Sequence, residues 1–194
     1  MKRFLHQHTL PLAVALLSLL LQLNGDTATL LLRFDRPLIA EGEVWRLLTG
    51  NLVHLGWNHL WMNLAGLGLI WAIFYRHFNQ WQWLAILLVS ELGVGLGLWF
   101  FNPELHWYVG LSGALHGLFA IGLCAQLRQR DRFDRILLAL FIAKLAWEQW
   151  SGELPSSAAL AGGPVIVDAH LYGAVTGFVL GVGYWVATRG RSRP

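Results

Sequence analysis

The sequence carries little charge for its length. Asp, Glu, Lys and Arg make up 13% of its 194 residues, against roughly 25% in soluble domains. It has a single cysteine, Cys124, so an internal disulfide is excluded. It also lacks His-Glu-x-x-His, the ligand motif of many zinc proteases, and we expect no metal and no cofactor. These absences exclude a disulfide-stabilised secreted domain and argue against an ordinary soluble enzyme.

Long apolar runs take the place of the missing charge. Hydrophobic residues make up 56% of the chain, and the mean hydropathy is +0.50. A helix that crosses a bilayer needs about 20 mainly apolar residues. We therefore predict an all-α membrane protein, one domain over residues 1–194 with six membrane-spanning helices. The expected spans are 9–23, 52–75, 81–101, 111–127, 136–150 and 170–187. The eleven tryptophans fit aromatic residues at membrane–water interfaces.

Two of these spans are open to other interpretations. The first is short and follows Lys2 and Arg3, as in a cleaved signal peptide. No small-x-small cleavage site follows Leu23, so we favour a retained helix. The fifth span, 136–150, is the weakest, because Lys144 lies within it and Glu148 lies near its end.

Basic residues gather on one side of the six spans. The positive-inside rule therefore predicts that both termini are cytoplasmic. On the opposite side, the segment 30–46 is expected to lie in the outer interface, with Trp45 as an anchor. Topology explains the basic residues, so we expect a lipid bilayer and no nucleic acid as their partner. The basic residues on the inner side are Lys2, Arg3, Arg76, Arg128, Arg130, Arg132, Arg135, Arg189, Arg191 and Arg193.

Polar residues of three spans fall at nearly the same depth. At about 1.5 Å per helical residue, the flanking arginines place Ser112, His170 and His59 about 24–28 Å above the cytoplasmic edge. Asn63 lies about 6 Å lower. All four are expected in the outer part of the membrane, where polar side chains are costly and usually functional.

Glycines spaced by four residues indicate that two of these helices touch. Gly113 and Gly117 follow Ser112, and Gly173 and Gly177 follow His170. Such spacing lets membrane helices pack backbone to backbone. Close packing would bring the hydroxyl and the imidazole within the roughly 2.6–3.2 Å that proton transfer requires.

His59 and Asn63 share one face of the second span because they are four residues apart. Their donors, together with the backbone N–H of Ser112, could stabilise an oxyanion.

Simpler interpretations exist for each of these features when it is taken alone. The glycines could serve ordinary helix packing, the histidines a proton path, and the His59–Asn63 pair a helix–helix contact.

The motifs around these residues resemble those of the rhomboid family. Gly-x-Ser-Gly occurs at Gly110–Gly113, Ala-His-x-x-Gly-x-x-x-Gly at Ala169–Gly177, and His-x-x-x-Asn at His59–Asn63, with His54 at the usual offset before it. Trp45-Arg46 matches a motif of the family's first loop. The motifs occur in the family's order along the chain.

The resemblance implies a rhomboid-like bundle and intramembrane proteolysis by a serine–histidine dyad. Ser112 would be the nucleophile and His170 its base, with His59, Asn63 and the Ser112 backbone as oxyanion hole. Supporting roles would fall to Gly110, Gly113, His116, Gly117, Gly173, Gly177 and His54.

One departure from the family pattern narrows the resemblance. Many rhomboids have tyrosine four residues after the serine, where this sequence has His116. His116 could stack on His170, form a hydrogen bond, or add a second titrating group. The form Gly-Leu-Ser-Gly-x-Leu-His-Gly and the short chain look like the rhombosortase branch. That likeness implies membrane-anchored substrates with Gly-Gly-containing C-terminal transmembrane tails, in a bacterial inner membrane, with the active site opening toward the periplasm.

Three other functions remain open at this stage: a general rhomboid protease with other single-span substrates, a non-catalytic binder of membrane helices, and a small proton-coupled transporter. The binder is disfavoured because Ser112 and His170 are both present, and the transporter because paired acidic residues at mid-membrane are few. Glu91 and Lys144 are expected to be structural, paired with each other or facing water. Asp168 is not expected to join the dyad, since residues two apart on a helix do not face each other.

Overall fold

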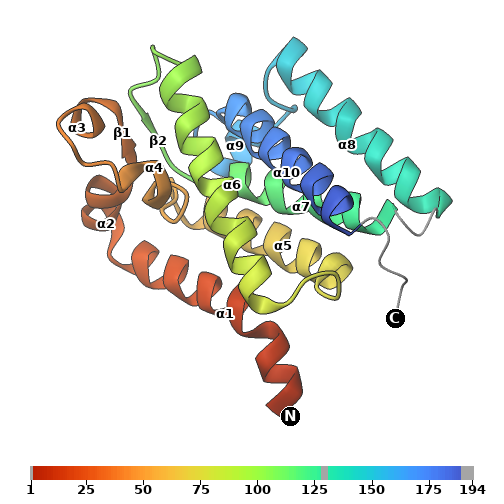
Figure 1. The fold of residues 1–194 in the computed structure, drawn as a ribbon. Helices are drawn as coiled ribbons and strands as arrows, with labels where there is room; N and C mark the ends of the chain where they lie inside the picture. The colour runs from red at the N-terminus through yellow and green to blue at the C-terminus, as the bar shows by residue number, and fades with distance from the viewer. Residues whose placement is uncertain (1, 128–130, 189–194) are drawn as a thin grey trace.

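The computed structural model describes residues 2–127 and 131–188. In this part of the chain, helices dominate and two short strands pair with each other (Figure 1). The helices are α1 (Lys2–Leu23), α2 (Gly25–Leu32), α3 (Arg36–Ala40), α4 (Arg46–Thr49), α5 (Trp57–Phe74), α6 (Gln80–Phe101), α7 (Ser112–Gln126), α8 (Arg132–Ser151), α9 (Ser157–Ala161) and α10 (Val167–Ala187). The strands are β1 (Phe34–Asp35) and β2 (Trp107–Tyr108).

Each of the six expected spans overlaps one long helix: α1, α5, α6, α7, α8 or α10. Only α6 and α10 are both long and apolar enough to cross a membrane by themselves. A third span is possible where residues 8–23 of α1 continue into α2 through a bend of 114°. This statement covers the described residues alone, and the six-span topology stays a prediction. Of the basic residues on which the orientation rests, Arg128, Arg130, Arg189, Arg191 and Arg193 lie outside the described residues.

The second span begins later than the sequence predicts. Residues 52–56 are not helical, and α5 starts at Trp57. The reason is a set of loop contacts around Gly50. A methyl group on Gly50 would come within 2.6 Å of the Phe34 backbone nitrogen, and the Gly50 carbonyl accepts a hydrogen bond from Gly110 N–H at 3.0 Å. The chain before α5 is therefore held against β1 and against the approach to α7.

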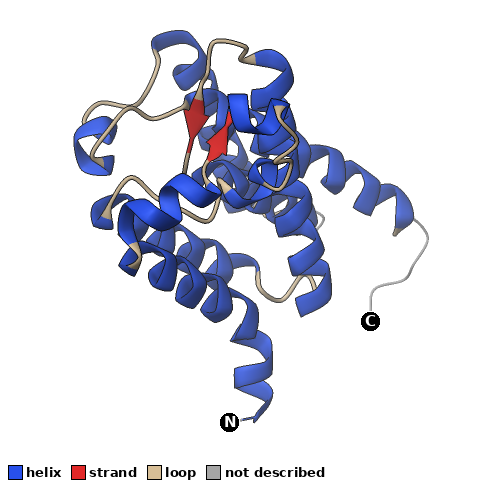
Figure 2. Cartoon of the chain, turned by 90° about the vertical axis from the view of Figure 1, so that its left-hand side faces the viewer, coloured by secondary structure: helices blue, strands red, loops and turns tan. Residues whose placement is uncertain are grey.

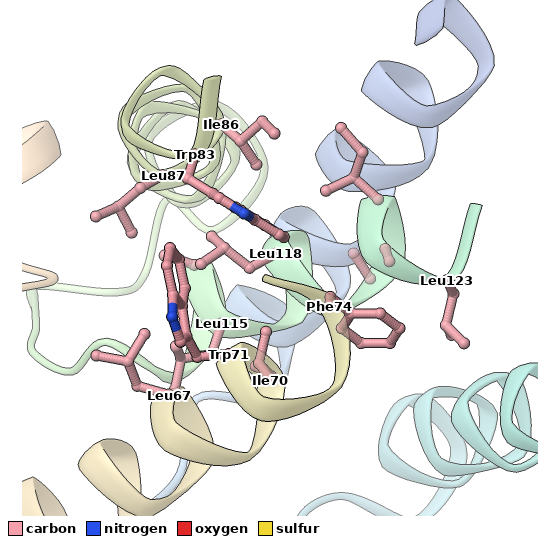
Figure 3. Close-up of a cluster of buried hydrophobic side chains, with 14 of the residues drawn as sticks. Leu67, Ile70, Trp71, Phe74, Trp83, Ile86, Leu87, Leu115, Leu118 and Leu123 are labelled. Atoms are coloured by element: carbon pink, nitrogen blue, oxygen red, sulfur yellow. The ribbon is translucent and has the colours of Figure 1, made fainter. Parts of the chain in front are cut away.

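The main core joins buried apolar side chains of all six long helices, and large residues of α5, α6 and α7 lie within it. Trp71 and Phe74 of α5 pack with Trp83 of α6 and Leu118 of α7, and all four are buried (Figure 3). Aromatic rings meet inside this cluster, with the centroids of Trp71 and Trp83 5.5 Å apart. The core holds α5 and α6 against the helix that begins at Ser112.

A smaller cluster of buried apolar side chains lies where the two strands meet the end of α6. Figure 2 shows the two strands in red. β1 and β2 are antiparallel, with Phe34 opposite Tyr108. Arg36 secures this end because its guanidinium donates hydrogen bonds to four backbone carbonyls at and after the end of α6, those of Leu98, Trp99, Asn102 and Leu105, at 2.7–3.0 Å. Cations at a helix C-terminus also complement the helix dipole. Trp45, expected as an interface anchor, is 49% exposed.

Candidate active site

Ser112 and His170 meet near the N-termini of two adjacent helices. Ser112 is the first residue of α7, and His170 lies in the first turn of α10. The Ser112 Oγ and His170 Nε2 are 3.0 Å apart. His170 is buried, whereas Ser112 is partly accessible. The geometry allows the hydroxyl to donate to the imidazole, the arrangement that a nucleophile and its base need.

Four glycines account for this proximity. A methyl group on Gly173 would overlap the carbonyl oxygen of Gly113, and one on Gly177 would overlap that of Gly117. A methyl group on Gly117 would in turn lie 3.0 Å from the Gly173 carbonyl oxygen. The two backbones are thus in direct contact just below the Ser112–His170 pair, as small-residue spacing in membrane helices allows.

His59 and Asn63 of α5 line the same cavity as Ser112 and His170. Leu55 N–H donates to His59 Nδ1 at 3.3 Å, so a neutral imidazole carries its proton on Nε2. Asn63 Nδ2 donates to the His59 carbonyl at 3.1 Å. Both side chains are donors beside the serine, although neither hydrogen-bonds to it in this structure.

Gly110 fits closely against the His59 ring. Its φ of +122° lies in a region that L side chains rarely adopt. A methyl group there would also come within 2.8 Å of His59 Nε2. The Tyr108 hydroxyl donates to the Gly110 carbonyl at 2.6 Å. His54, in the loop before α5, contacts the His59 ring edge to face, with centroids 5.1 Å apart.

His116 both stacks and hydrogen-bonds, two of the possibilities that the sequence left open. Its ring lies nearly parallel to that of His170, with centroids 4.2 Å apart and an interplanar angle of 15°. Its Nδ1 is 2.7 Å from the Ser112 carbonyl oxygen. On its other side it stacks on Phe141 of α8. His116 therefore fixes the plane of the His170 imidazole.

Two charged residues of α8 complete the cluster, and sequence reasoning assigned neither to it. Both carboxylate oxygens of Glu148 lie 3.1 Å from His170 Nδ1. Lys144 Nζ donates to Glu148 Oε2 at 2.7 Å and also contacts His116 and His170. The sequence left Lys144 either paired with Glu91 or facing water, and the structure pairs it instead with the carboxylate one turn further along its own helix.

One sequence signal could have found this ion pair. Oppositely charged residues spaced by four in an apolar helix indicate a pair on one face. No spacing, however, links α8 to the distant His170.

Asp168, which the sequence did not assign to the dyad, points away from His170 toward Asn102. Its carboxylate accepts a hydrogen bond from Asn102 Nδ2 at 2.5 Å.

Three of these groups also form a possible metal-binding set. Ligand atoms of His116, Glu148 and His170 lie within 4.8 Å of one another. Lys144 Nζ contacts all three side chains. The Lys144 ammonium thus provides the positive charge that a metal ion would otherwise bring to these three ligands.

Two cavities reach Ser112 and His59. The larger, about 500 Å³, runs between α5 and α8, and apolar side chains such as Leu69, Leu140 and Phe141 line much of it. The smaller, about 240 Å³, lies on the side of β2 and the segment before α10. Ser112 therefore borders both cavities.

Comparison with known proteins gives a consistent result. Residues 41–187, more than half of the chain, match the model of the rhomboid domain. The chain is 28% identical over 142 residues to the putative rhomboid protease YdcA of Bacillus subtilis (strain 168), covering 73% of this chain and 68% of that protein. It is 32% identical over 127 residues to the rhomboid protease GluP of the same organism, covering 63% of this chain and 25% of that protein. It is 29% identical over 143 residues to rhomboid-like protein 11, chloroplastic, of Arabidopsis thaliana, covering 70% of this chain and 51% of that protein.

Proposed function

Because this chain belongs to the rhomboid family of intramembrane serine proteases, we propose that it cleaves membrane-anchored proteins with Ser112 as nucleophile and His170 as general base. The observation that carries the proposal is the 3.0 Å contact between Ser112 Oγ and His170 Nε2. That distance lies within the range needed for proton transfer, about 2.6–3.2 Å. The neighbouring apolar cavity suits a substrate that arrives from the lipid phase.

In the proposed reaction, Ser112 Oγ bonds to the scissile carbonyl carbon while its proton moves to His170 Nε2. The carbonyl electron pair becomes an oxyanion, for which the proposed donors are His59 Nε2–H, the Asn63 amide and the Ser112 backbone N–H. All three residues line the larger cavity, which supports this assignment. The tetrahedral intermediate collapses with cleavage of the C–N bond, and the proton passes from His170 to the departing amine. Water then attacks the acyl-enzyme with His170 again as base.

The proposed substrates are exported proteins with a Gly-Gly-containing C-terminal transmembrane tail, as the likeness to rhombosortases implies. A peptide must leave the helical state for its carbonyl to reach a serine, and glycine lowers the cost of leaving a helix. A general rhomboid protease with other single-span substrates is the alternative specificity. We place the protein in a bacterial inner membrane with six spans, both termini cytoplasmic and the active site toward the periplasm.

The test uses a secreted reporter joined to a transmembrane tail through Gly-Gly. The reporter is coexpressed with the protein or its variants in host cells that have no copy of their own. We expect Ser112→Ala and His170→Ala to abolish cleavage while both variants accumulate in the membrane. Ser151→Ala, at the exposed end of α8, is the matched control and should cleave normally. Cleavage by the Ser112 and His170 variants would instead favour a non-catalytic helix binder. A second reporter with Leu-Leu in place of Gly-Gly tests the specificity, since equal cleavage of both would favour the general protease.

A further inference from the structure

We propose that Glu148 is a positioning residue for the His170 base, so that the site works as a Ser112–His170–Glu148 triad with Lys144 as counter-ion. This inference rests on the proposed function of Ser112 and His170. It adds a carboxylate from α8 to a site otherwise built from α5, α7 and α10.

The geometry places Glu148 on the nitrogen opposite to the serine. Both Glu148 oxygens are 3.1 Å from His170 Nδ1, while His170 Nε2 faces Ser112 Oγ at 3.0 Å. A carboxylate accepts hydrogen bonds and cannot donate them. It therefore selects the tautomer with the proton on Nδ1, which leaves Nε2 free to take the serine proton.

One set of proton positions gives each polar group of the cluster a partner, with Lys144 Nζ and His170 Nδ1, which lie 3.3 Å apart, both donating to Glu148. Lys144 donates to Glu148 and to His116 Nε2, and His116 Nδ1–H donates to the Ser112 carbonyl. His170 Nδ1–H donates to Glu148, and Ser112 Oγ–H donates to His170 Nε2. In this state both histidines are neutral and the charges of Lys144 and Glu148 cancel. Fully satisfied buried networks of this kind hold their members in one arrangement.

The burial of Glu148 indicates that it is not an ordinary surface ion pair. Its side chain is 3% exposed and that of Lys144 is 26% exposed. A buried carboxylate is costly unless it is paired and hydrogen-bonded. A pair that served only α8 would not need both carboxylate oxygens on an imidazole of another helix. When the serine proton reaches Nε2, His170 becomes an imidazolium, and Glu148 is the anion that faces it.

The experiment measures the rate at which a fluorophosphonate probe labels Ser112 in the full-length protein in detergent. This reaction needs the nucleophile and its base but no knowledge of the natural substrate. Ser112 Oγ bonds to phosphorus, fluoride leaves, and His170 takes the hydroxyl proton. We expect Glu148→Gln to lower the maximal labelling rate at least tenfold, and up to about 10⁴-fold, as loss of the orienting carboxylate does in a serine triad. The probe concentration for half-maximal rate should change little. Glu148→Asp keeps the charge and should recover part of the rate.

The matched control is Glu91→Gln. Glu91 is a buried carboxylate of α6 whose Oε1 has no hydrogen-bond partner among the described residues, so this variant should label at the wild-type rate. If Glu148→Gln does not accumulate because Lys144 is left unpaired, the double variant Lys144→Met with Glu148→Gln removes both charges. The proposal requires this double variant to label more slowly than the single variant Lys144→Met, because only the double variant lacks the Glu148 carboxylate.

A second readout does not depend on catalysis. In protein labelled with ¹⁵N-histidine, the Nδ1–H of His170 held by a carboxylate should give a downfield proton resonance that is absent from His170→Ala and from Glu148→Gln. Wild-type labelling by Glu148→Gln, with that resonance unchanged, would overturn the triad and leave the serine protease intact. Failure of the wild-type protein to label at all would instead count against the proposed function.

Discussion

Gly113 and Gly173 touch backbone to backbone immediately below the Ser112–His170 hydrogen bond. A methyl group on Gly173 would overlap the Gly113 carbonyl oxygen, and one on Gly113 would lie 2.9 Å from the Ala169 carbonyl oxygen. The distance between hydroxyl and imidazole is therefore set by two main chains in contact, with no side chain between them.

Gly173→Ala should consequently separate α7 from α10. We expect a loss of about 1–3 kcal/mol in the free energy of unfolding, the usual cost of overpacking. We also expect the rate of probe labelling to fall, because the Ser112–His170 distance increases. Unfolding in detergent followed by tryptophan fluorescence measures the first quantity. Gly183→Ala is the control on the same helix, since nothing lies within 4 Å of a methyl group there. Equal behaviour of the two variants would contradict the backbone contact.

Asn63→Ala should reduce turnover of the tailed reporter while leaving its apparent affinity nearly unchanged. Loss of one oxyanion donor costs about 10²–10³ in kcat in serine proteases. Asn58→Ala, on an exposed position of the same helix, should have no effect. A change in KM with kcat unchanged would indicate that Asn63 binds the substrate and does not stabilise the oxyanion.

His116→Tyr should retain more activity than His116→Ala. Both variants lose the bond from the His116 imidazole to the Ser112 carbonyl. Tyrosine keeps an aromatic ring where His116 stacks on His170 at 4.2 Å, whereas alanine removes the stack as well. Aromatic pairs contribute about 0.5–1.5 kcal/mol beyond their buried area. We therefore expect a difference of about two- to tenfold in labelling rate, since about 1.4 kcal/mol corresponds to a factor of ten. Equal rates would show that the stack does not position the base.

Lys144→Ala should make the protein sensitive to zinc. Without the ammonium, ligand atoms of His116, Glu148 and His170 remain within 4.8 Å of one another, and zinc takes imidazole and carboxylate ligands. We expect micromolar zinc to stop probe labelling of this variant, chelation to restore it, and the wild-type protein to resist the same concentration. Inhibition that persists in the further variant Lys144→Ala with His116→Ala would place the metal elsewhere.

Much of the site could be predicted from sequence because it follows helical periodicity and chain order. Gly113 with Gly117, His59 with Asn63, and His170 with Gly173 are each three or four residues apart on a single helix, where spacing alone determines which residues share a face. The apolar runs likewise indicate the long helices, although the start of α5 was missed because contacts around Gly50 hold residues 52–56 out of the helix.

The contribution of α8 could not be predicted in the same way. Glu148 meets His170 across two helices separated by α9 and its loops, and only tertiary packing determines that contact. The sequence left Glu91 and water as the alternatives for Lys144, because sign of charge alone does not show which helices face each other. The partner in the structure, Glu148, lies one turn along the same helix.

The two cavities that meet at Ser112 have a consequence for the sequence of events after the first bond breaks. A transmembrane segment between α5 and α8 would fill the apolar cavity and shield the acyl bond on that side. The opening beside β2 would remain free. Under the proposed function, water could then reach the acyl bond through this opening while the severed helix is still in place, so release of the anchor need not precede hydrolysis.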